Sequence, residues 1–282
     1  ENQWGFVDFN RPMVAINQWE QAEDSMYTLC GKDRIHPSTD GHLVMAYLFL
    51  KAQGLAGKPV ADIRIDGAGK KVTRSDNCRV SDLSVSSDNL TFTYEAKSLP
   101  YPIDTSYYDN EKHTQADALS VIPFMDEMNY EGLSVSGLSD GYYGLTIGGE
   151  FIGRFTAREL ERGINMALLQ NTPQYKQAMK IRQMNEERWL KERKMREFYW
   201  VEYNLMRKTG MLWACNEAAV DTLRKYRPHD IFLQWNGDLW LQYMHKGIRE
   251  DCVNEQQDLV NQIYEQNKPI PLRIEIKKFT DL

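Results

Sequence analysis

The sequence predicts an incomplete α/β segment followed by an antiparallel β domain that carries a large α-helical insertion. Three features predict this fold class. Residues 1–56 have the patterns of a strand, a helix, a loop and a second helix, which are the elements of an α/β layer. Residues 57–155 contain short segments in which apolar and polar side chains alternate, as they do in strands. Residues 156–267 have helical patterns, and residues 270–278 return to the alternation of a strand.

In the first segment, residues 4–9 predict a short buried strand and residues 13–22 predict a helix. The side chains at 38–40 are all good N-cap residues, so a second helix should begin there and end just before Gly54. This second helix is apolar almost all round, and we expect neighbours to cover it on several sides. A whole α/β layer needs more such units, so this segment would be the end of a larger domain.

The second segment contains several strand patterns. Residues 61–66 and 89–95 alternate, and residues 144–153 predict a hairpin with Gly148 and Gly149 at its turn. We expect an antiparallel sheet, or a sandwich. Residues 100–125 interrupt the pattern with Pro, Tyr and Asp, which predicts a long excursion rather than a tight turn.

The helical segment begins with a capping-box pattern, Thr156 to Glu159. We expect a helix there with Leu160, Ile164 and Ala167 on one face. A second helix should start at Pro173, the favoured first position.

The second helix could extend to Gly210. Further helices are expected at 211–226, 237–246 and 248–266. Residues 272–276 alternate and should join the antiparallel sheet, which makes the helical block an insertion in the β domain.

Composition excludes several classes of protein. The 282 residues are 42% hydrophobic and 26% charged, as in a soluble globular protein of one large or two ordinary domains. The net charge is −6, which argues against a nucleic-acid partner because phosphate binding needs a basic face. The longest apolar run, residues 43–50, is too short to span a membrane.

The cysteines give no sign of a metal site. No C-x-x-C pair occurs, so we expect no zinc site. We also expect no cofactor and no other metal. One or two disulfides and buried free thiols are both compatible with the spacing. The four cysteines are Cys30, Cys78, Cys215 and Cys252.

The candidate site is the run from Asp33 to His36, which Pro37 and the predicted second helix follow. A carboxylate bonded to one imidazole nitrogen fixes the tautomer of a catalytic His and stabilises the imidazolium that forms during reaction. The other ring nitrogen can then face a nucleophile. The alternative is a loop salt bridge at a helix entrance. Asp40 and His42 could extend the group to a metal cluster, but the turn and the helix start should point the side chains apart.

Two stretches carry a resemblance to a known family. "DRIHPSTDGHLVMAYLFLKAQGL", preceded by "GFVDFNRPM", resembles the end of an SGNH/GDSL hydrolase domain, in which a D-x-x-H block comes just before the last helix. "YGLTIGGEFIGRFTARELERGINMALL" is similar to the C-terminal extension of large bacterial members. The resemblance implies that residues 1–56 end a flavodoxin-like layer, that Asp33 is the triad acid and that His36 is the base. It also implies a substrate such as an acylated carbohydrate or another small ester, and a periplasmic or secreted location.

The family's nucleophile block, Gly-Asp-Ser, is absent. Asp24-Ser25-Met26 follows Glu23 instead of Gly and lies immediately before the D-x-x-H block. The pairs at 81–82, 87–88 and 139–140 have the reversed order, Ser-Asp. The Gly and Asn blocks that complete the oxyanion hole are also missing. We therefore expect the nucleophile on a missing N-terminal segment upstream of Glu1 or on a partner chain.

The second hypothesis is a non-enzymatic glycan-binding, protein-binding or assembly module that retains a remnant of the hydrolase domain. Aromatic side chains in the excursion could line a sugar-binding surface, or could simply pack the loop; they are Tyr101, Tyr107 and Tyr108, with His113 beside them. An incomplete layer would also expose apolar surface from residues 4–9 and 43–50, which predicts a homo-oligomer or a partner chain.

Overall fold

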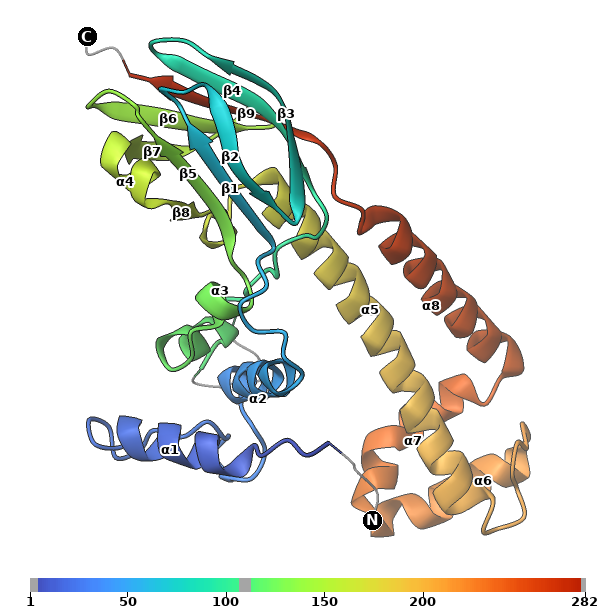
Figure 1. Ribbon diagram of the computed structural model, residues 1–282. Coiled ribbons are helices and arrows are strands. Elements are labelled where there is room, and N and C mark those ends of the chain that lie inside the picture. Colours follow the sequence, from blue (N-terminus) through green and yellow to red (C-terminus); the bar gives the residue numbers. More distant parts are fainter. Residues whose placement is uncertain (1–4, 107–112, 280–282) are drawn as a thin grey trace. The chain divides into compact units, whose positions relative to one another are not determined.

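A computed structural model of the chain describes residues 5–106 and 113–279. The chain divides into two compact units (Figure 1). Unit 1 comprises Glu1–Ala178 and Lys268–Leu282, and unit 2 comprises Met179–Asn267. Among the described residues, no helix combines the length and the apolar character needed to cross a membrane.

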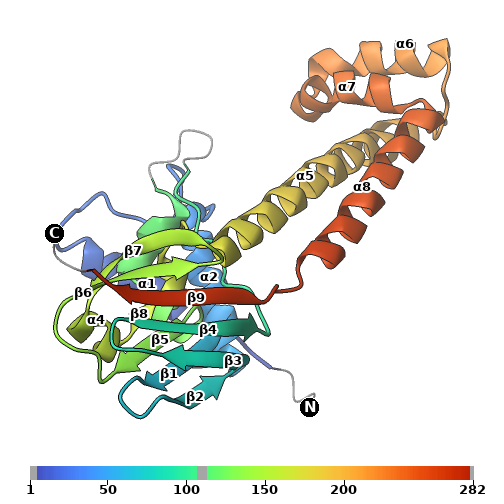
Figure 2. The ribbon, with the colours of Figure 1, turned by 90° about the horizontal axis from the view of Figure 1, so that it is seen from above.

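The strands of unit 1 form two sheets. The first has the order β2-β1-β5-β8, with bounds β1 Ala61–Asp66, β2 Lys71–Asp76, β5 Glu131–Ser136 and β8 Ile164–Asn165. The second has the order β3-β4-β9-β6-β7, with bounds β3 Cys78–Val85, β4 Asn89–Ala96, β6 Tyr142–Ile147, β7 Glu150–Thr156 and β9 Leu272–Lys278. In Figure 2 the last strand, β9, lies between β4 and β6.

The two sheets share one hydrophobic core. Ile63 and Leu133 from the first sheet lie in the same buried cluster as Phe92, Leu145 and Ile274 from the second. Removing such a side chain from water stabilises the fold by roughly 1.5–3 kcal/mol. The sandwich, one of the two expectations for the alternating segments, is therefore confirmed. The final strand joins the antiparallel sheet as expected, and it pairs there with β4 and β6.

One pairing differs from the antiparallel expectation for residues 57–155. β1 and β5 are parallel, with Ile63 opposite Leu133. Parallel neighbours need a long crossover connection, and residues 67–130 provide one that passes through the other sheet. Alternation within a strand shows which side chains face inward, but it carries no information on the direction of a distant partner.

The N-terminal part of unit 1 is helical. Its helices are α1, Asn10–Glu20, and α2, Thr39–Ala52. The strand predicted for residues 4–9 is wrong for the described residues 5–9, which have no neighbouring strand to pair with. Within residues 5–56 the described backbone forms one isolated bridge, between Cys30 and Pro37. A flavodoxin-like layer therefore stays a prediction.

The second predicted helix is confirmed, with Ser38 at its N-cap and Gly54 in the left-handed region after its end. Its buried face packs against the 100–125 excursion, which contains a 3₁₀ turn, η1, Gln115–Ser120, and a short helix, α3, Phe124–Glu127. Phe49, on the same helix, is exposed within the described residues, so cover on several sides stays a prediction.

The capping box at Thr156 and Glu159 is confirmed and opens α4, Ala157–Arg162. This helix stops at Gly163, which has a φ of +94°. Ile164 and Ala167 therefore do not share a face with Leu160, because the first lies in β8 and the second in the 3₁₀ turn η2, Met166–Leu168. Gly relieves the steric cost of a positive φ and so ends the helix earlier than its apolar spacing suggests.

Unit 2 is a helical bundle. Its elements are α5, Pro173–Val201, which begins in unit 1; the π-helical turn η3, Glu202–Met206; α6, Glu217–Tyr226; the 3₁₀ turn η4, Arg227–His229; α7, Ile231–Tyr243; and α8, Lys246–Gln266. Asn216 and Asp230 cap α6 and α7 through their side chains, which moves both helix starts from the expected positions. The buried carboxylate of Glu202 accepts the indole N–H of Trp240 (2.8 Å) and the backbone N–H of Trp213 (2.8 Å), which holds the turn in the core.

Candidate functional site

The loop from Cys30 to Pro37 connects the region after α1 to the start of α2. Its two ends are held together by backbone hydrogen bonds: Gly31 N–H donates to the His36 carbonyl (2.7 Å), and Ser38 N–H donates to that of Leu29 (3.0 Å). Arg34 turns the loop with a φ of +56°. The loop therefore brings the residues on either side of Arg34 back toward each other.

Asp33 and His36 are brought together as expected. His36 Nδ1 lies 2.5 Å from Asp33 Oδ2. The other carboxylate oxygen, Oδ1, accepts the backbone N–H groups of Ile35 (3.0 Å) and His36 (3.1 Å). The hydrogen bond from His36, with those from the backbone, lowers the pKa of Asp33 to about 2. The pair is thus an ionised carboxylate that accepts a hydrogen bond from His36 Nδ1.

The second ring nitrogen of His36 faces outward. The His36 side chain is 82% exposed and that of Asp33 is 47% exposed. Over residues 5–106 and 113–279, no hydrogen bond reaches His36 Nε2. Such a pair can act as a general base with its orienting acid, if a nucleophile lies against the open ring nitrogen.

The serine residues that follow or precede an Asp in this sequence do not fill that position. Asp24 Oδ1 accepts the N–H of Met26, so Asp24-Ser25-Met26 is a local turn after α1. The Ser81 and Ser87 hydroxyls donate to the Asp residues next to them, and that of Ser139 contacts Tyr143. No described serine hydroxyl is hydrogen-bonded to His36.

The other two members of the possible metal cluster point elsewhere. Asp40 is buried beneath the loop and contacts Ser38, whereas His42 is exposed on α2. In the part of the chain that the structure describes, no group of three or more His, Cys, Asp or Glu side chains could hold a metal ion. The four cysteines are free thiols, and burial raises the pKa of the Cys78 thiol.

Several large apolar side chains in the N-terminal part of unit 1 are uncovered. Phe6 is 84% exposed, Trp19 on α1 is 80% exposed and Ile35 in the loop is 75% exposed. None of the residues of α1 is buried. Large apolar surface of this kind is typical of a site where another chain segment or protein packs.

The aromatic residues of the excursion have different environments. The rings of Tyr101 and Phe124 pack in a T-shaped arrangement, with 5.7 Å between their centroids. The Tyr101 hydroxyl accepts a hydrogen bond from the Gln115 amide (2.8 Å). Tyr107 and Tyr108 lie outside the described residues. The contacts of Tyr101 are those of a loop packed by its own side chains, and a sugar-binding surface stays a prediction.

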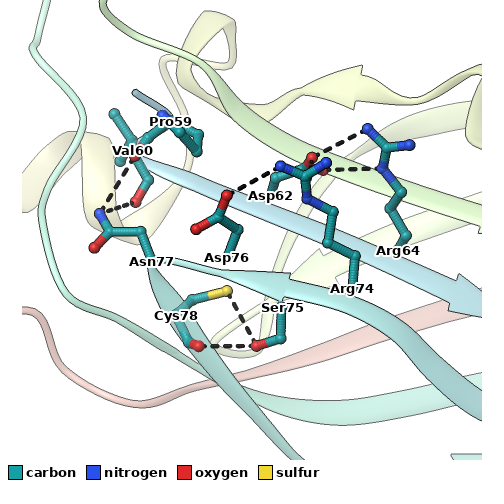
Figure 3. A network of polar contacts seen from close by, with 9 residues as sticks. All are labelled: Pro59, Val60, Asp62, Arg64, Arg74, Ser75, Asp76, Asn77 and Cys78. Atoms are coloured by element: carbon teal, nitrogen blue, oxygen red, sulfur yellow. Dashed lines mark hydrogen bonds and ion pairs between the residues drawn. The ribbon is translucent and has the colours of Figure 1, made fainter. Parts of the chain in front are cut away.

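A second polar network lies where the first sheet begins (Figure 3). The nearly buried Asp62 accepts from Arg64 (3.1 Å) and Arg74 (2.9 Å), and Arg74 also pairs with Asp76 (3.0 Å). The charges of the two guanidinium groups and the two carboxylates cancel, so the network has no net charge with which to bind an ionic ligand. The Asn77 side chain donates to the Val60 carbonyl (2.9 Å), so the network ties β1 to the turn between β2 and β3.

A glycine packs the start of α2 against the base of the loop. A Cβ on Gly41 would lie 2.0 Å from the Leu29 carbonyl oxygen. We expect Gly41→Ala to push these segments apart and to destabilise unit 1 by about 1–3 kcal/mol in urea unfolding. Gly247→Ala is the control: the same helix-favouring change at a site with nothing within 4 Å should be neutral or slightly stabilising. Equal effects of the two substitutions would contradict the packing argument.

The chain is similar to known enzymes in its fold and in its helical unit. Residues 179–268 match a family model described as the diltiazem deacetylase C-terminal helical domain. The solved structure of a gut microbial diltiazem-metabolizing enzyme matches with a TM-score of 0.92 and 42% identity, over 99% of this chain and 63% of that chain. The search of curated proteins found no match. The chain thus spans about 63% of that enzyme's length, and its helical unit is similar to the C-terminal helical domain of diltiazem deacetylases.

Proposed function

We propose that this chain is the C-terminal part of a serine ester hydrolase of the SGNH type. The observation that carries the proposal is the Asp33–His36 pair, 2.5 Å apart on an exposed loop just before α2, with His36 Nε2 open. The likeness to a diltiazem-metabolizing enzyme supports an esterase, because deacetylation of such a molecule is the hydrolysis of an ester.

In this proposal His36 transfers the proton, and Asp33 holds the His36 ring in the orientation that the transfer needs. Nε2 accepts the proton of a serine hydroxyl as that oxygen attacks the ester carbonyl, and the Asp33 carboxylate stabilises the imidazolium. The imidazolium then gives the proton to the departing alcohol, which leaves an acyl-serine. Water, deprotonated by His36, attacks the acyl-serine and releases the carboxylic acid and the free serine.

The nucleophilic serine and the oxyanion donors would come from sequence outside these 282 residues, on an N-terminal segment or a partner chain. The open Nε2 supports this, since a triad needs a hydroxyl there. The uncovered side chains of Phe6, Trp19 and Ile35 also support it, because a further part of an α/β layer would bury them. A second copy of this chain is the other partner that could cover them.

The proposed substrate is a small acetyl ester. The relatives are named for diltiazem, and the D-x-x-H block resembles that of enzymes that remove acetyl groups from carbohydrates, so both ester types are candidates. The same resemblance suggests a periplasmic or secreted protein.

Acetate release tests this function. The 282-residue chain and the same chain extended by the sequence that precedes it would be incubated with diltiazem and with acetylated xylo-oligosaccharides. We expect release by the extended protein alone. His36→Ala should abolish it, whereas His42→Ala, an exposed histidine on the next helix, should not.

Two outcomes would contradict the proposal. Activity of the 282-residue chain alone would place the nucleophile within it. Binding of acetylated oligosaccharide without hydrolysis, unaffected by His36→Ala, would favour the non-enzymatic binding module.

A further inference from the structure

The D-x-x-H loop has little packing of its own. Both reactive side chains are largely exposed, and their geometry depends on the backbone N–H groups of Ile35 and His36 and on closure of the loop at its base. A catalytic pair has to be held near its productive geometry before substrate arrives. Leu29 and Ser38 form the base of the loop. The contacts that hold these two residues in place therefore also position the Asp–His pair.

A buried carboxylate lies directly under this base. Asp40, the second residue of α2, is 0% exposed. Its Oδ1 accepts the backbone N–H of Gly41 (2.8 Å) and contacts the hydroxyl of Ser38. That same hydroxyl lies 3.0 Å from the Leu29 carbonyl oxygen, which also accepts the Ser38 backbone N–H. Ser38 is the N-cap residue of α2 but does not cap with its side chain, because its hydroxyl bridges Leu29 and Asp40 instead.

The other carboxylate oxygen faces a different part of the chain. Asp40 Oδ2 is buried, with no hydrogen-bond donor within reach among the described residues. The nearest charge partner is His113 Nδ1, at 3.6 Å. His113 comes just before η1, and its ring meets that of Tyr27 in a T-shaped arrangement with 5.8 Å between the centroids. Burying a carboxylate oxygen without a hydrogen-bond donor costs free energy, so the His113 ring beside Asp40 Oδ2 would stabilise it.

We propose that Asp40 is a positioning residue of the hydrolytic site, one that fixes the Asp33–His36 pair through Ser38 and is itself held by His113. The claim that this positioning serves catalysis rests on the proposed function, whereas the claim that Asp40 holds the pair in place does not. Asp40 thus links three segments: the base of the loop, the first turn of α2 and the excursion that covers α2.

The carboxyl of Asp33 provides a direct readout. Its pKa of about 2 depends on the same contacts that define the pair, and would return toward 3.8 if the loop opened. Carboxyl ¹³C NMR from pH 6 down to 3.5 distinguishes the two values, because an Asp with the ordinary pKa is about two-thirds protonated at the lower limit. We expect the pKa of Asp33 to rise in Asp40→Ala and, to a smaller extent, in Ser38→Ala and His113→Gln.

Asp62→Asn is the matched control, since it also changes a nearly buried carboxylate of unit 1 with charged partners, but within the sandwich network of Figure 3. It should lower stability and leave the pKa of Asp33 at about 2. If Asp40→Ala does not fold, the pKa of Asp33 in Ser38→Ala and in His113→Gln tests the inference instead. An unchanged Asp33 pKa in folded variants would overturn the inference and leave Asp40 a purely structural residue.

Kinetics separate this inference from the proposed function. In the extended hydrolase, Asp40→Ala and Ser38→Ala should lower kcat by about 10- to 100-fold with little change in KM, since misplacing a catalytic group affects the chemical step. A rise in the Asp33 pKa, combined with absence of esterase activity even in the parent protein, would support the positioning and contradict the proposed function.

Discussion

Replacing Asp33 with Asn is expected to lower kcat of the extended hydrolase by about 10³- to 10⁴-fold, with a small change in KM. The Asn amide would donate to His36 Nδ1, which the carboxylate cannot do. The imidazole would then carry its hydrogen on Nε2 and could not accept the proton of the serine. Steady-state hydrolysis of an acetyl ester between pH 5 and 9 measures the effect.

The low pKa of Asp33 adds a prediction about pH. Because the pKa lies at about 2 in the folded protein, below the usual 3.8, the carboxylate stays ionised as the pH falls, and its stabilising contact is lost only as the pH approaches about 2. Any fall in the hydrolysis rate of the unsubstituted protein between pH 5 and 4 should therefore not arise from Asp33.

The control for Asp33→Asn is Asp24→Asn, in the exposed turn after α1, which should leave the hydrolysis rate unchanged. A loss of less than tenfold in Asp33→Asn would contradict the assigned role.

Replacing Glu131 with Gln is expected to remove much of the pH dependence of the stability of unit 1. Glu131 is buried in the sandwich, where it accepts from the Tyr94 hydroxyl (2.8 Å) and the Gln174 amide (3.2 Å). Burial raises the pKa of Glu131 from 4.5 to about 7. The stabilisation that protonated Glu131 gives the folded state is thus fully present below pH 4.5 and is lost as the pH rises through about 7. By linkage the loss is about 3 kcal/mol.

Gln is neutral at every pH and keeps an acceptor for Tyr94. Its amide can also donate to Gln174 Oε1, which is buried without a hydrogen-bond partner among the described residues. The free energy of unfolding of Glu131→Gln, relative to the parent, should therefore increase by about 3 kcal/mol between pH 4.5 and 8. Urea titrations read by pulsed hydrogen exchange of the β5 peptide report on the sandwich and not on unit 2.

Glu95→Gln is the control for this measurement. Glu95 is held by Arg79, which lowers its pKa, so over most of the range from pH 4.5 to 8 it is ionised in both the folded and the unfolded chain and should add little slope. The account of Glu131 would be contradicted by a stability difference between Glu131→Gln and the parent that is the same at both pH values.

Local features were predictable from the sequence. The spacing of Asp33 and His36, with Pro37 and N-cap residues after them, predicted a loop that pairs the two side chains, because every interaction involved is within a few residues. The capping box predicted the start of α4 for the same reason, and the start of α2 was also predicted, although the Ser38 side chain does not cap that helix. The hairpin between β6 and β7 followed from its two glycines, both with positive φ.

Non-local features were not predictable. The contact between Asp40 and His113 joins residues far apart in the chain, and no local pattern distinguishes a buried Asp at a helix start from an exposed one. The parallel pairing of β1 with β5 likewise depends on the route of the intervening chain. Residues 4–9 have the apolar pattern of a strand, but a strand also needs a neighbour, and the described part of the chain offers none.

Labelling with a fluorophosphonate probe tests the central claim most directly, because the probe forms a covalent bond with a serine that a histidine base activates. The extended protein and the 282-residue chain would each be treated and the labelled peptide identified by mass spectrometry. The account predicts one labelled serine, located outside these 282 residues, in the extended protein, and loss of the label in His36→Ala. A labelled serine within the 282-residue chain, or labelling that survives His36→Ala, would contradict it.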